Sequence, residues 1–145
     1  MSKILLILLS FFLFSCSGKD VSESISKTVN QDVALQIYSE AIEALESGDA
    51  FYAAKKFKEA EILLPSNEWA AKASIMSAYA NYTRNAYTQS VFKLERHIKK
   101  YPADKNLSYA HYLIAICYFE QILDEKKDLK PLLMAKEKFE FVILN

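Results

Sequence analysis

Residues 48–65 constrain the fold of this chain more than any other stretch. They begin with Gly48 and Asp49, which interrupt the preceding segment because Gly permits positive φ and Asp can cap the next helix. Small and aromatic side chains then recur at i, i+4 and i+7, on one face of a helix. These side chains are Ala53, Phe57 and Ala60. Pro65 ends the helix, and the two alanines leave room for neighbours, so we predict a helix that is packed on both sides.

The segment before this helix, from about Asp32 to Ser47, is also predicted to be helical, because its apolar residues stand at helical spacing. The chain of 145 residues holds only two Gly and three Pro, which favours helices with short connections. The two helices and their turn span about 34 residues, the period of the tetratricopeptide repeat. Residues 48–65 resemble the second helix of that repeat, with Gly-Asp, Ala, an aromatic residue, Ala and Pro at matching positions.

Two further copies of this unit follow. The second copy, counted back from Pro102, places three residues at core positions of its second helix: Ser90, Leu94 and His97. The third copy starts near Leu107, contains a charged loop at 124–130, and would close beyond Asn145, so we expect it to be truncated. The units are about 32–65, 66–102 and 107–145. The sequence therefore predicts an all-α fold, an α-solenoid of tetratricopeptide-like helix–turn–helix repeats with about two and a half repeats present.

The start of the chain is predicted to be a targeting segment. Lys3 precedes an apolar run that is too short to span a bilayer but suits the core of a signal peptide. The run ends in Leu-Phe-Ser-Cys, which resembles a bacterial lipobox and implies cleavage after residue 15 and lipidation of Cys16, including a palmitate chain. The alternative is an ordinary signal peptide with a chance Cys. Residues 16–31 are rich in Ser and charge and are predicted to form a polar tether.

No catalytic constellation, metal-ligand spacing or phosphate loop is recognisable, so the sequence predicts neither an enzyme nor a cofactor. The 18 basic residues balance the 18 acidic ones, which gives no reason to expect nucleic acid as a partner. His97 and Cys117 are interpreted as packed core residues. The basic residues between Lys93 and Lys100 are interpreted as a solvated helix end that suits the helix dipole.

The aromatic residues supply the candidate binding site. In this repeat the first helices line the concave face, and the predicted register places eight residues there. They are Tyr38, Ile42, Leu45, Ile75, Tyr79, Tyr82, Tyr112 and Phe119. A wall with four tyrosines suits an extended peptide, since the rings offer area at low entropic cost and the hydroxyls can bond main-chain groups. The alternative is that these side chains only pack helix against helix.

A lipobox, a short polar tether and tetratricopeptide-like repeats together resemble the BamD family, lipoproteins of the outer-membrane β-barrel assembly (BAM) machinery. Two segments resemble parts of that family, Ala-Tyr-Ala-Asn-Tyr at 78–82 and Ile-Lys-Lys-Tyr-Pro at 98–102. The resemblance implies a non-enzymatic protein, anchored through Cys16 to the outer membrane of a Gram-negative bacterium and facing the periplasm. Its implied partners are unfolded β-barrel precursors, BamA and other BAM lipoproteins. The alternative is another periplasmic tetratricopeptide lipoprotein, acting as a scaffold for cell-wall enzymes or the Tol–Pal system.

Overall fold

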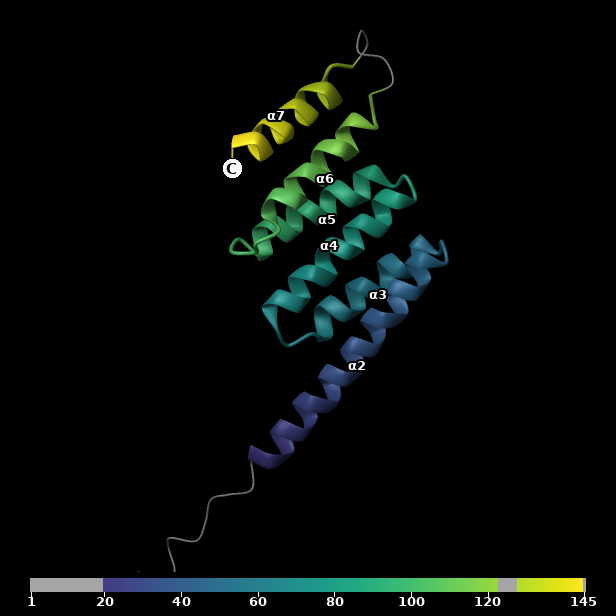
Figure 1. Ribbon diagram of the computed structural model, residues 1–145, viewed down its shortest axis with the longest axis vertical. Coiled ribbons are helices and arrows are strands. Elements are labelled where there is room, and N and C mark those ends of the chain that lie inside the picture. Colours follow the sequence, from purple (N-terminus) through teal and green to yellow (C-terminus); the bar gives the residue numbers. More distant parts are fainter. Residues whose placement is uncertain (1–19, 123–127, 145) are drawn as a thin grey trace, which may run out of the picture.

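The computed structural model of this chain describes residues 20–122 and 128–144, and within 20–30 it describes the backbone only. These parts form six helices, which are α2 (Asp20–Glu46), α3 (Ala50–Leu63), α4 (Asn67–Thr83), α5 (Tyr87–Lys100), α6 (Leu107–Phe119) and α7 (Lys130–Leu144). Each helix packs on the next one along the chain, so that the helices form an elongated stack (Figure 1). The predicted all-α solenoid of tetratricopeptide-like hairpins is thereby confirmed.

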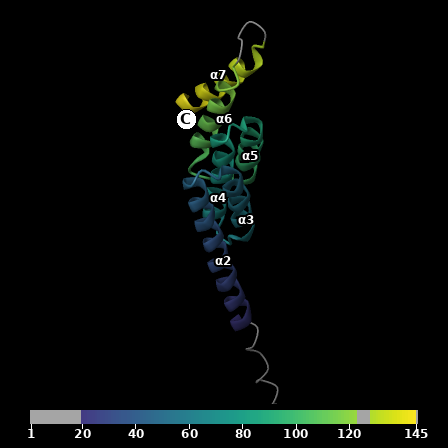
Figure 2. The same ribbon diagram turned by 90° about the vertical axis from the view of Figure 1, so that its right-hand side faces the viewer.

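The helices of the first two hairpins are arranged in two layers. A quarter turn of the view places α3 and α5 on one side of the stack and α2 and α4 on the other (Figure 2). This alternation is the arrangement expected when the first helix of each hairpin lines one surface and the second helix lines the opposite surface. In the third hairpin, α7 packs on α6.

Helix α3 forms as its sequence predicts. Gly48 has a φ of +88°, in the left-handed region that favours glycine. The Asp49 side chain accepts a hydrogen bond from the backbone N–H of Tyr52 at 3.0 Å, which caps the new helix. The three signature residues on the packed face are fully buried, and these are Ala53, Phe57 and Ala60. Pro65 follows directly after the C-cap residue, Leu64.

The second hairpin uses a different turn for the same purpose. Asn85 adopts a φ of 62° between α4 and α5, a conformation that Asn tolerates better than most residues. Ser90, at a position where the repeat has a small residue, is fully buried and donates a hydrogen bond to the carbonyl of Ala78 at 2.9 Å. Leu94 and His97 are also fully buried, so the three predicted core positions of this helix are confirmed.

Helix α2 begins at Asp20, twelve residues before the expected start at Asp32. Residues 20–31 were assigned to the polar tether, and they are helical in the structure. The segment contains no Gly or Pro, so no local signal stops the helix from extending toward the N-terminus. Polarity alone therefore did not mark the helix boundary.

Several predictions lie outside the described residues. They concern the signal peptide, Cys16 and most of the charged loop at 124–130. Within residues 20–122 and 128–144, none of the helices combines the length and the apolar character that crossing a bilayer requires.

Candidate functional site

A cleft of about 590 Å³ lies between the N-terminal halves of α4 and α6. Its lining residues come from α4, α6 and the loop that joins α5 to α6, and they are Glu68, Trp69, Lys72, Ile75, Met76, Lys105, Asn106 and Tyr109. Trp69 and Tyr109 are 43% and 42% exposed. The α2 residue Tyr38 meets the Trp69 ring edge to face, with centroids 6.0 Å apart. The lining side chains therefore come from the second and third repeats, and Tyr38 of the first repeat contacts one of them.

The charges at the cleft are mostly paired. Lys105 Nζ donates to Glu68 Oε1 at 2.7 Å, and this bond lowers the pKa of Glu68 and raises that of Lys105. The same pair borders a second hollow of about 450 Å³ beside residues 100–105. Lys72 Nζ lies 4.9 Å from the centroid of the Trp69 ring, a cation–π contact. The cleft thus has two half-exposed aromatic rings and one ammonium, that of Lys72, without an ion pair to any described residue. This lining favours an extended, mainly apolar ligand over a strongly charged one.

A series of tyrosines continues beyond the cleft along α4 and α6. The ring centroids of Tyr79 and Tyr82 are 6.1 Å apart, and those of Tyr109 and Tyr112 are 6.4 Å apart. Burial raises the pKa values of Tyr82 and Tyr109, with smaller contributions from neighbouring tyrosines and, for Tyr82, from Glu120 and Cys117. These hydroxyls therefore stay protonated at neutral pH and can donate hydrogen bonds to main-chain carbonyls.

Five of the eight predicted groove residues lie in or beside this surface. Ile75 lines the cleft although it is only 6% exposed, and Tyr38 borders it. Tyr79 and Tyr82 are half-buried and pack against the core cluster around Leu94. Tyr112 is exposed beside Tyr109. Packing and exposure are thus combined in the same side chains, where the sequence had offered them as alternatives.

The other three predicted groove residues do not line the cleft. Ile42 and Leu45 pack against the core cluster around Phe57. Phe119 is exposed at the C-terminal end of α6, whereas the cleft lies at the N-terminal end of that helix. Helical spacing placed these side chains on first helices but could not show where along the helices a hollow forms.

Sequence reasoning missed Trp69, Lys72, Met76 and Tyr109. A signal was present, because Trp69 stands seven residues before Met76 and ten before Tyr79, which places all three on one helical face. Tyr109 likewise stands three residues before Tyr112 on the face of α6 that was predicted to bind. The predicted groove residues started only at Ile75 in α4 and at Tyr112 in α6, and so left out the first turns of both helices.

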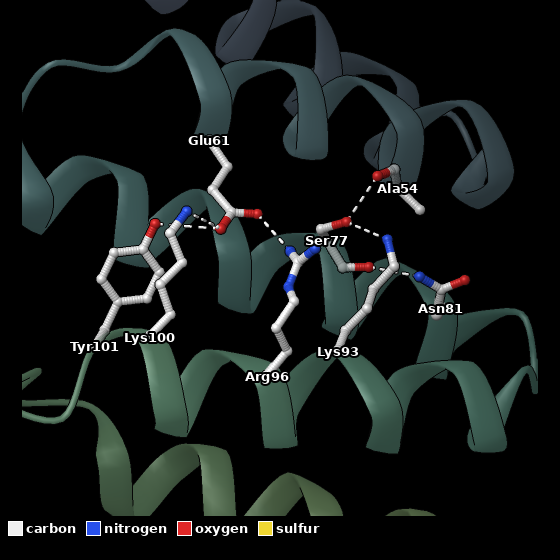
Figure 3. Close-up of polar contacts among 8 residues, drawn as sticks. All are labelled: Ala54, Glu61, Ser77, Asn81, Lys93, Arg96, Lys100 and Tyr101. Carbon is white, nitrogen blue, oxygen red and sulfur yellow. Dashed lines mark hydrogen bonds and ion pairs between the residues drawn. The ribbon is translucent and has the colours of Figure 1, made fainter.

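The basic end of α5 is not simply solvated, contrary to the interpretation from sequence. Glu61 of α3 is buried, and its carboxylate accepts bonds from Arg96 at 2.7 Å, from Lys100 at 2.9 Å and from the Tyr101 hydroxyl at 3.2 Å (Figure 3). This cluster joins α3 to α5 across the outer layer. The repeat pattern did not indicate that Glu61 would join α3 to α5, because its position is not one of the signature positions.

Cys117 and His97 are titratable side chains that are fully buried in the described part of the core. Burial raises the pKa of the Cys117 thiol, which disfavours the reactive thiolate. His97 is fully buried with Nε2 3.1 Å from Asp104 Oδ2, and burial lowers its pKa. Within the described residues, no three His, Cys, Asp or Glu side chains come together as metal ligands would.

Comparison with known proteins agrees with the fold. The model of the YfiO family, described as an outer membrane lipoprotein, matches residues 30–145. Similar proteins include the outer membrane protein assembly factor BamD of Caulobacter vibrioides, 38% identical over 92 residues that cover 63% of this chain and 30% of that protein. BamD of Rickettsia prowazekii is 29% identical over 138 residues, which cover 95% of this chain and 53% of that protein.

The matched part thus spans about a third to a half of the length of these relatives. The resemblance to the BamD family that the motifs indicated is confirmed for the N-terminal part. Because the family match takes in most of the sequence and the repeats lie within it, this chain belongs to the YfiO family of outer membrane lipoproteins.

Proposed function

We propose that this chain is part of a lipoprotein of the β-barrel assembly machinery and that it binds unfolded outer-membrane β-barrel precursors in the periplasm. The aromatic cleft between α4 and α6 is the observation that supports the proposal most directly. Strands of outer-membrane barrels alternate apolar and polar residues, so an unfolded strand offers an aromatic or aliphatic side chain at every second position. The cleft and the adjoining tyrosines offer rings and hydroxyls to such a segment.

The proposal includes a lipid anchor at Cys16 and partners named for the machinery, BamA and other BAM lipoproteins. The relatives are named as assembly factors, which favours a non-enzymatic role and favours barrel assembly over a scaffold for cell-wall enzymes or the Tol–Pal system. Mass spectrometry of the mature chain tests the anchor, since a Cys16→Ser variant should lose the acyl mass. Co-purification from membranes with BamA tests the partner, and its absence with the complete protein would contradict this part of the proposal.

The cleft contains its own reporter. Trp69 is the only tryptophan of the chain, so its emission reports on this site alone. We expect a peptide from the C-terminal strand of an outer-membrane barrel protein to shift that emission to shorter wavelength, because the peptide displaces water from the ring. A fluorescently labelled copy of the same peptide gives the affinity by anisotropy.

Substitution then tests the site. Trp69→Ala with Tyr109→Ala should weaken peptide binding by about tenfold or more, because both rings line the cleft and are half exposed. The matched control removes two other exposed aromatics, with Tyr52→Ala and Phe92→Ala, which lie on α3 and α5. Equal losses in the two double variants, or unchanged affinity in the first, would remove the cleft from the proposal.

Tyr79→Ala with Tyr82→Ala is a weaker test than the sequence suggested. We expect this variant to bind the peptide less well, but both rings also pack against the core cluster around Leu94. Its unfolding curve therefore has to be recorded with its affinity, and only a loss of binding at unchanged stability counts for the tyrosine series.

A further inference from the structure

The layer of α3 and α5, with the turn between α4 and α5, carries a cluster of basic side chains that the proposed function does not use. We call it the basic strip, and its members are Lys58, Arg84, Lys93, Arg96 and Lys100. Lys58 stands one turn before Glu61 on α3, and Lys93, Arg96 and Lys100 stand at helical spacing on α5, so these side chains share the surface where Glu61 joins the two helices. Arg84 follows α4 directly, and its charge acts on Lys93 together with those of Arg96 and Lys58. Glu61 is the carboxylate that faces them, and it is already bonded to Arg96 and Lys100. The strip therefore sets five positive charges against one negative charge.

The positive charge is concentrated at one end of the strip. Arg84 donates to Asn81 Oδ1 at 3.0 and 3.2 Å and to Gln89 Oε1 at 3.4 Å, so its polar partners are neutral. Lys93 Nζ donates to Ser77 Oγ at 2.5 Å, and that hydroxyl donates to the carbonyl of Ala54 (Figure 3). Among the described residues, no ion pair joins Lys58, Arg84 or Lys93 to a carboxylate.

Lys93 shows what this crowding costs. Burial first, and then repulsion by Arg96, Lys58 and Arg84, lowers its pKa to about 8, while the attraction of Glu61 opposes this shift. A carboxylate placed beside Lys93 would relieve the repulsion and favour the charged ammonium. The site is thus incomplete in charge, and the buried Arg96 Nε also lacks a hydrogen-bond partner.

We propose that the basic strip docks an acidic, extended segment of a partner protein, with Asp or Glu carboxylates pairing with Lys58, Arg84 and Lys93. The position of Lys93 favours a protein segment over an anionic lipid surface. Its side chain runs from α5 toward Ser77 of α4 and lies partly buried between the outer helices (Figure 3). A protruding carboxylate side chain can reach that depth, whereas a flat membrane cannot. This inference goes beyond the proposed function, since the strip belongs to the layer of α3 and α5 and the cleft does not.

The test uses the full chain immobilised on a biosensor and a short capped peptide of alternating Glu and Ala. We expect this peptide to bind. The same peptide with Gln in place of Glu should bind at least about tenfold more weakly. Lys58→Gln with Arg84→Gln should weaken binding of the Glu peptide by about tenfold. The matched control, Lys55→Gln with Lys99→Gln, removes the same charge from exposed lysines of α3 and α5 and should change the affinity by less than about twofold.

Three results would overturn the proposal. The first is an equal loss in both double variants, which would show attraction by net charge alone. The second is strip-dependent binding of phosphatidylglycerol vesicles without binding of the Glu peptide, which would assign the strip to lipid. The third is equal binding of the Glu and Gln peptides.

Two further measurements keep the result interpretable. Far-UV circular dichroism checks that the double variant folds, and if it does not, Lys58→Gln alone carries the test, because this exposed side chain makes no ion pair or hydrogen bond. The Glu peptide should leave Trp69 emission unchanged, and the Lys58 and Arg84 variant should bind the barrel peptide normally. Failure of the strip is thus distinguishable from failure of the cleft.

Discussion

At the scale of single residues, Glu61 is a buried carboxylate with three polar partners. Its buried carboxylate accepts three bonds from α5 and the residue after it, and so ties α3 to α5. Removing one partner of a buried ion pair costs about 3–5 kcal/mol, but the Arg96 and Lys100 side chains are 39% and 50% exposed and can regain hydration. We therefore expect Glu61→Ala to lower the free energy of unfolding by about 2 kcal/mol, measured by urea denaturation.

The control for Glu61 lies on the same helix. Glu59 is exposed and makes a single i,i+3 ion pair with Lys56 at 3.7 Å, so Glu59→Ala should change the stability little. A similar loss in both variants would show that the effect comes from the net charge or helix propensity of α3. In that case the buried cluster would not be its source.

His97 makes stability depend on pH. Burial lowers its pKa below the ordinary 6.5, against the attraction of Asp104 and Glu61, so the folded chain binds a proton less readily than the unfolded chain. The contribution of neutral His97 to the free energy of unfolding is fully present above pH 6.5. It is lost as the pH falls through 6.5 toward the lowered pKa of His97. We expect the melting temperature to fall between about pH 7.5 and pH 5.5.

His111 contributes in the same direction, because burial and Lys138 lower its pKa as well. His97→Gln and His111→Gln should therefore each reduce the pH-dependent loss of melting temperature, and the double variant should remove most of it. If the melting temperature of the double variant fell with pH as much as that of the unchanged protein, the carboxylates and not the histidines would cause the pH dependence.

At the scale of elements, the turn into α3 depends on backbone conformation alone. A Cβ atom at Gly48 would meet no atom within 4 Å, so Gly48→Ala is opposed by the positive φ and not by a clash. We expect Gly48→Ala to cost about 1 kcal/mol. Gly48→Asn should cost less, since Asn85 adopts a similar φ in the next hairpin. Thermal unfolding of both variants checks the order, and an equal cost would point to a lost contact.

The elements also show what the sequence could predict. Residues 48–65 carry a turn, a cap, a packed face and a stop within one stretch, and the structure has each of them where the sequence placed it. The start of α2 was placed too late, because residues 20–31 were assigned to a tether from their polarity although they contain no Gly or Pro that would end a helix. Helix ends were thus predictable where specific residues stop the backbone hydrogen bonding.

The candidate site was only partly predictable for a related reason. Periodicity placed Tyr79 and Tyr112 on the faces of α4 and α6 that adjoin the cleft, because it depends on spacing within one helix. The cleft depends on how far apart two helices start, and the loop at 101–106 sets that offset. Trp69 and Tyr109 line the cleft from two different helices, which spacing within one helix cannot show.

At the scale of the whole molecule, the stack has no single centre. Its described residues form three core clusters: those around Ala34 and Phe57 both join α2, α3 and α4, and the one around Leu94 joins α4, α5 and α6. Helices pack mainly on their neighbours in sequence, so the stability of each part is set by the interfaces next to it. A ligand that bridges α4 and α6 across the cleft would therefore stiffen the second and third repeats together.

Local interfaces also predict an order of opening. Nine residues of α4 are buried and it packs on α3, α5 and α6, whereas Ala135 is the one buried residue of α7. Because local opening is easiest where few apolar contacts are lost, backbone amides of α7 should exchange with deuterium before those of α3 to α6, and those of α4 should exchange last. Mass spectrometry of peptic fragments measures this order. If α7 and α4 are equally protected at low protein concentration, this order is contradicted. If the protection of α7 rises with protein concentration, a second copy of the chain covers the exposed Ile143 and Leu144.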